Sequence, residues 1–112
     1  MKYKYGKYSS AQMHSTKLSI RRSIFYLLLY ADPETKDKYK DIDVAKAIRN
    51  LQYKLNGLNR LLFEPPELVL TMSILETVLE EYTSESYDWR KYRKLVLDAG
   101  AEIMKIREGD QK

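Results

Sequence analysis

Side chains that carry catalysis or hold a metal ion are scarce in this chain, and their spacing suits neither task. The sequence has one histidine, His14, and no cysteine, so a histidine-based triad or a histidine and cysteine metal cluster has too few members. Glu76 and Glu80 share one helical face but lack the Glu-x-x-His spacing of a di-metal site in a helical bundle. Three aspartates lack the central glycine and distal glutamate of a calcium loop: Asp37, Asp41 and Asp43. The sequence predicts a non-enzymatic protein with no metal, no other cofactor and no small-molecule substrate.

The basic residues near the N-terminus have the spacing of a nucleic-acid-binding arm. Within residues 1–8 lysines alternate with tyrosines, and residues 1–31 contain no acidic side chain. Ammonium groups displace counterions from phosphates, while phenol rings stack on bases. The basic stripe continues along the helix expected next, so the candidate phosphate contacts are Lys2, Lys4, Lys7, Lys17, Arg21 and Arg22.

The tyrosines of this arm also fit a structural role. If Tyr3, Tyr5 and Tyr8 face inward, the arm forms an extended cover over the first helix, and the lysines keep its outer side in water. The sequence leaves both alternatives open.

A second basic cluster lies at the start of the last expected helix, where positive charge opposes the helix dipole. Its members are Arg90, Lys91, Arg93 and Lys94. The cluster either contacts phosphate or pairs, across the turn of a helical hairpin, with Glu80, Glu81 and Glu85. Lys94 also precedes Asp98 by four residues, the spacing of an exposed ion pair.

The elements that must position these residues are helices. Apolar side chains recur with helical spacing over residues 15–32, 43–63, 66–82 and 86–108. Pro33 and Pro65-Pro66 mark two boundaries, and the polar connection 32–43 has room for a short helical turn. Asn56-Gly57 predicts a kink or a short break in the second helix. The expected N-caps are Ser15 or Thr16, Asp43, and Ser86 or Asp88.

The predicted fold is all-α. The chain has 112 residues, with four glycines and three prolines. These are too few turn-forming residues for the many turns of a β-sandwich. Four helices with one wide apolar stripe each form a four-helix bundle-like single domain, residues 15–110. An extended, basic, tyrosine-rich arm, residues 1–14, precedes it.

One half-helix has no polar side. Residues 24–31 read Ile-Phe-Tyr-Leu-Leu-Leu-Tyr-Ala, and a helix that is apolar all round must be covered. We expect a homodimer contact here, or the tyrosine-rich arm folded back as a cover. The predicted interface residues are Ile24, Phe25, Tyr26, Leu28, Leu29 and Tyr30.

The charge and the apolar runs also bear on location and partners. No apolar stretch follows the basic N-terminus as in a signal peptide, and the longest apolar run is far shorter than the roughly 20 residues of a membrane span. We therefore expect a cytoplasmic protein without a membrane contact.

Two classes of macromolecular partner remain open. The net charge of +4 and the basic clusters favour nucleic acid. The size, the basic balance and the helical hairpins resemble small four-helix immunity proteins of bacteriocin producers and short helical proteins of phages and plasmids. No motif carries residues over from these proteins. The competing class of function is a protein-binding inhibitor, adaptor or immunity factor, whose expected contact is the acidic segment 76–85 or an aromatic group: Tyr82, Tyr87, Trp89 and Tyr92.

Overall fold

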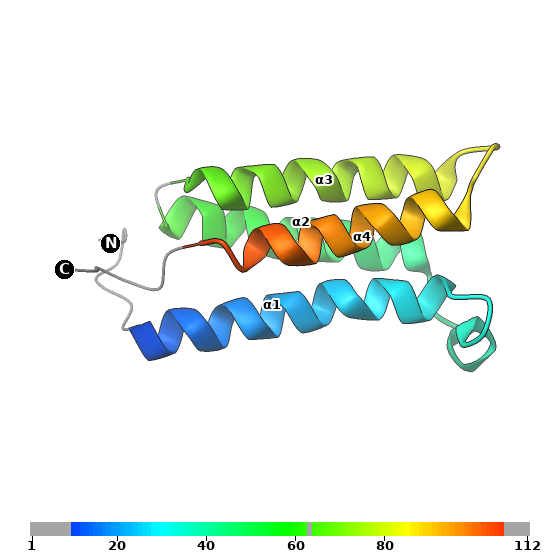
Figure 1. The fold of residues 1–112 in the computed structure, drawn as a ribbon, viewed down its shortest axis with the longest axis horizontal. Coiled ribbons are helices and arrows are strands. Elements are labelled where there is room, and N and C mark those ends of the chain that lie inside the picture. The colour runs from blue at the N-terminus through cyan, green and yellow to red at the C-terminus, as the bar shows by residue number, and fades with distance from the viewer. Residues whose placement is uncertain (1–9, 63, 107–112) are drawn as a thin grey trace.

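The computed structural model describes residues 10–62 and 64–106, and these residues form helices and no strand. The α-helices run antiparallel in turn along an elongated bundle of 46 × 23 × 21 Å (Figure 1). Their bounds are α1 Ser10–Ala31, α2 Val44–Leu61, α3 Pro66–Thr83 and α4 Trp89–Ile103, and a short 3-10 helix, η1, spans Lys36–Tyr39. The all-α prediction is confirmed.

The four helices form a ring in which the contact between α3 and α4 is the most extensive. Helix α4 packs against α3 on one side and α1 on the other, while α2 packs mainly against α3 and much less against α1. The core lies along the middle of this ring. Its fully buried side chains include Ile24 of α1, Ile48 of α2, Leu75 of α3 and Tyr92 of α4. No helix in the described part of the chain has the length and apolar character that crossing a membrane requires.

Local signals set most helix boundaries as the sequence predicts. The Asp43 carboxylate accepts a hydrogen bond from the Lys46 amide at 3.1 Å, and the Asp88 carboxylate accepts one from the Arg90 amide at 2.9 Å. Both are N-caps that satisfy amides of a first helical turn. α3 begins at Pro66, whose missing N–H is not needed at that position.

Three boundary predictions are wrong. α1 begins at Ser10, so residues 10–14 are helical and do not belong to an extended arm. Met13 is buried there and extends the apolar stripe by one turn. Residues 1–9 of the predicted arm lie outside the described residues.

The other two errors concern a glycine and the last helix. α2 continues through Asn56-Gly57 without a break, because buried Leu51 and Leu55 before the glycine and Asn59 after it hold the helix on the core. α4 ends at Ile103, about one turn before the predicted end. The buried Ile106 then follows in a turn and not in helix.

Candidate functional site

The apolar half-helix of α1 has one covered side and one open side. Ile24, Leu27 and Leu28 are buried in the core, whereas Phe25 is 51% exposed and Tyr26 is 40% exposed. Two of the predicted interface residues, Ile24 and Leu28, therefore serve the chain's own core. Leu29 and Tyr30 are half-buried. The part of the chain that the structure describes therefore covers this side of α1 only in part.

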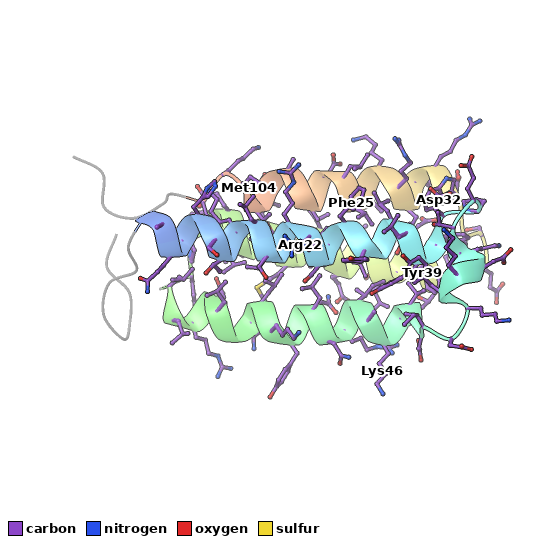
Figure 2. The ribbon with its side chains drawn as sticks, turned by 90° about the horizontal axis from the view of Figure 1, so that it is seen from below. Arg22, Phe25, Asp32, Tyr39, Lys46 and Met104 are labelled. Atoms are coloured by element: carbon purple, nitrogen blue, oxygen red, sulfur yellow. The ribbon has the colours of Figure 1, made fainter. Side chains whose placement is uncertain are left out.

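Phe25 borders a groove between α1 and α4. The groove has a volume of about 400 Å³, and Arg21 is its one charged lining residue. A second hollow of about 340 Å³ continues along α1 past Leu18 and Arg22. Figure 2 shows Phe25 and Met104 on the border between the two helices and Arg22 on α1 beside them. The groove is lined by Arg21, Ile24, Phe25, Leu28, Val96, Leu97, Gly100, Ala101 and Met104.

Small side chains on α4 leave this space unfilled. Gly100 and Ala101 lie between Leu97 and Met104 on the side of α4 that faces α1. A Cβ atom at Gly100 would meet Ile24 at 4.0 Å, an ordinary contact distance, so the two helices are not in tight backbone contact there. A larger residue at either position would occupy the groove and cover Phe25.

The electrostatic environment of the groove is positive. Arg21 and Arg22 are exposed on α1, and Arg93 is exposed one turn before Leu97 on α4. Two nearby carboxylates of α4 already have partners. Asp98 pairs with Lys94 at 3.1 Å, as predicted, and Glu102 pairs with Lys105 at 3.1 Å. None of the groove-lining residues is acidic.

The start of α4 is packed with aromatic rings. Tyr92 has its ring centre 5.7 Å from that of Tyr82 and 5.8 Å from that of Trp89. Its hydroxyl is buried and donates to the Leu27 carbonyl of α1 at 2.6 Å. Burial, followed by the nearby Tyr87 and Tyr82, raises the pKa of Tyr92 well above 10.0. Tyr92 is thus a structural residue, and of this aromatic group only Tyr87, at 38%, is among the exposed large apolar residues.

The predicted pairing of the α4 cations with the end of α3 is not found. The Glu81 carboxylate accepts a hydrogen bond from the Asp88 amide at 2.7 Å instead. Among the described residues, no ion pair joins Arg90 or Lys91 to a carboxylate. The carboxylate of Glu81 lies at the positive end of the α4 dipole, where negative charge is favourable.

The structure brings together only part of the predicted phosphate-binding set. Lys17 is 4% exposed, and its ammonium donates to the Ile106 carbonyl at 2.6 Å, so its predicted place on the surface is wrong. Lys2, Lys4 and Lys7 lie outside the described residues. The exposed members are Arg21, Arg22, Arg90, Lys91, Arg93 and Lys94.

The α4 wall of the groove was not predicted from the sequence, although a signal for it exists. Leu97, Ala101 and Met104 repeat with steps of four and three residues, beside the core stripe of the same helix. Within the described ranges, no cluster of three or more acidic or histidine side chains could hold a metal ion. Comparisons with protein-family models, curated proteins and solved structures find no match for this chain.

Proposed function

We propose that this chain is a non-enzymatic cytoplasmic interaction protein that binds a helical segment of another protein in the α1–α4 groove. One observation carries the proposal. Phe25 is 51% exposed at the edge of an apolar groove in which Arg21 is the one charged lining residue. Exposed apolar residues are ordinary when they are scattered, but a continuous apolar hollow with a polar rim is typical of an interaction site.

The shape of the groove favours a helix as its occupant. Two antiparallel helices form its walls, and Leu18, Phe25 and Leu97 are all exposed along it. An amphipathic helix laid between two helices inserts side chains at steps of three and four residues, in the manner of helix-in-groove recognition.

The charges of the groove favour an acidic partner. Arg21 and Arg22 stand on one wall, Arg93 stands at the end of the other, and no carboxylate lines the groove. Acidic residues flanking the apolar face of the partner would pair with these guanidinium groups. A second copy of this chain would instead bring its own Arg21 and Arg22 toward the same arginines, so the predicted homodimer is the weaker candidate.

This site fits the inhibitor, adaptor or immunity class better than nucleic acid binding. A nucleic-acid surface needs exposed cations and stacking rings, whereas the groove offers aliphatic walls and one charged lining residue. Nucleic acid stays a second candidate for the start of α4, because exposed Arg90, Lys91 and Arg93 have no carboxylate partner among the described residues.

The proposal is tested with two labelled helical peptides that share one leucine-rich face and differ only in acidic or basic flanking residues. Fluorescence anisotropy should show that the acid-flanked peptide binds about five- to thirtyfold more tightly, since two charge pairs at partly exposed sites contribute about 1–2 kcal/mol in sum. Phe25→Ser should abolish this binding. Tyr53→Ser removes a still more exposed aromatic ring from α2, away from the groove, and should leave binding unchanged.

Other results would contradict the proposed function or assign a different occupant to the groove. Equal binding of both peptides, or full binding by Phe25→Ser, contradicts the proposal. If light scattering finds a dimer that Phe25→Ser dissociates, the occupant is a second copy of the chain.

A further inference from the structure

The outer face of α2 carries a basic stripe with a tyrosine near its middle. Lys46, Arg49, Tyr53 and Arg60 follow one another at steps of three, four and seven residues, so they share one side of the helix. All four are exposed, and the buried residues of α2, such as Ile48 and Leu55, lie on the opposite side. Figure 2 shows Lys46 pointing away from the bundle. We call this set the α2 stripe.

Helix stability accounts for Arg60, a cation in the last turn of α2, but not for the other two charges of the α2 stripe. α2 contains Lys46, Arg49, Lys54 and Arg60 and no acidic residue. Lys46 lies in the first turn, where a cation opposes the dipole, and Lys46 and Arg49 are like charges three residues apart. In the part of the chain that the structure describes, none of the three cations of the stripe forms an ion pair. The stripe therefore presents unneutralised positive charge to solvent.

Tyr53 is unusually open for a large side chain. It is 82% exposed, far above the other large exposed apolar and aromatic residues that the structure describes, which reach 51% at most. Gly57 stands one turn after it, and a Cβ atom there would meet nothing within 4 Å. The faces of the phenol ring are thus accessible to a flat partner, and such a ring stacks on any nucleobase.

From this arrangement we propose that the α2 stripe binds single-stranded nucleic acid, with Lys46, Arg49 and Arg60 on phosphates and Tyr53 stacked on a base. The stripe extends for about 21 Å from residue 46 to residue 60, at about 1.5 Å per residue. A strand laid along it meets cations on both sides of the ring. This is the combination of backbone attraction and stacking that sequence-tolerant single-strand binding uses.

The neighbourhood of the stripe selects a single strand over a duplex. Stacking on Tyr53 needs an unpaired base. On the α3 side, Gln52 donates to the exposed Glu76 carboxylate at 2.9 Å, and Glu80 is exposed one turn later. These carboxylates would repel the phosphates of a second strand. The site is also separate from the α1–α4 groove, since α2 forms no part of that groove.

The test measures binding of a fluorescein-labelled oligothymidylate by anisotropy at about 50 mM salt and at higher salt. Three phosphate contacts predict a log–log salt slope of about −2, at about 0.7 per contact on a single strand. Tyr53→Ala should weaken binding about tenfold, and Tyr53→Phe should restore it. Arg49→Gln should weaken binding and reduce the slope by about 0.7.

Matched controls separate this site from general charge attraction. Lys36→Gln removes one exposed cation from η1 and should leave both affinity and slope unchanged, and Phe25→Ser should do the same. Circular dichroism should show that the exposed-site variants melt like the parent chain. Equal effects of Arg49→Gln and Lys36→Gln, an unaffected Tyr53→Ala variant, or equal binding of a duplex overturns the proposal. A lack of binding at about 50 mM salt overturns it as well.

Discussion

Helix α4 has a neighbour on each side, and the two contacts are filled to different degrees. Toward α3, the rings of Tyr82, Tyr87 and Tyr92 lie 5.6–5.9 Å apart and pack together where α3 passes into α4. Toward α1, Gly100 and Ala101 supply little side-chain volume, and a groove of about 400 Å³ remains. Both contacts involve apolar residues, so hydrophobicity alone does not decide which one closes. The size of the facing side chains does.

This contrast explains why α1 has an open apolar side. Phe25 has a hydrophobic environment available on α4, but Gly100 and Ala101 leave the groove beside it unfilled, and the ring stays 51% exposed. Interiors of proteins are packed as densely as organic crystals. We propose that this unfilled apolar groove receives a side chain from another molecule.

The largest expected effect concerns the hydroxyl that ties the closed side to α1. Tyr92→Phe keeps the ring packing but removes the hydrogen bond to the Leu27 carbonyl. Because both atoms are buried, the free energy of unfolding should fall by about 1–2 kcal/mol. Urea denaturation followed by circular dichroism measures this change. An unchanged midpoint would show that the hydrogen bond is absent in solution.

The same hydroxyl predicts a dependence on alkaline pH. The folded pKa of Tyr92 is raised by burial, while the unfolded chain ionises near 10.0. The contribution of Tyr92 is therefore fully present below pH 10 and is lost as the pH rises above it, because the unfolded state alone releases the proton. Between about pH 10 and 11 the parent chain should lose up to about 1.4 kcal/mol more than Tyr92→Phe. Equal losses would contradict the burial of this hydroxyl.

A smaller effect is expected when the open side is partly filled. Gly100→Ala adds a methyl group without a clash, since the nearest atom is 4.0 Å away. This substitution should raise the free energy of unfolding by about 0.5–1 kcal/mol, and it should weaken the binding of the acid-flanked peptide in the α1–α4 groove. Gly57→Ala, in open space on α2, should give the same stabilisation without affecting the peptide. If Gly100→Ala is destabilising while Gly57→Ala is not, α1 and α4 lie closer together at Gly100 than the 4.0 Å contact with Ile24 indicates.

Local sequence signals predict the ends of helices better than they predict surfaces. Pro65-Pro66, Asp43 and Asp88 act through their own backbone or side chain, so their roles follow from residue type. The predicted break at Asn56-Gly57 is not found, because a cost of about 1 kcal/mol for a glycine within a helix is smaller than the gain from burying the leucines of α2. Helix continuity there depends on the neighbouring helices.

The candidate site shows the same limit. Residues 24–31 predict an apolar segment that must be covered, whereas Phe25 and Tyr26 stay 51% and 40% exposed. The groove beside Phe25 is left open by Gly100 and Ala101, which lie far from it in the sequence. Lys17 fails as a surface residue for a similar reason. Its position on α1 places it beside Ile106, and the carbonyl of Ile106 accepts a hydrogen bond from its ammonium group.

The central claim is that the α1–α4 face is open in the isolated chain while the α3–α4 face is closed. The chain has no cysteine, so single-cysteine variants at Phe25 and at the fully buried Val78 report on the two faces separately. The measurement is the rate of thiol alkylation. Phe25→Cys should react nearly as fast as a free thiol at every protein concentration, whereas Val78→Cys should react only on unfolding. Protection of Phe25→Cys equal to that of Val78→Cys would contradict the account.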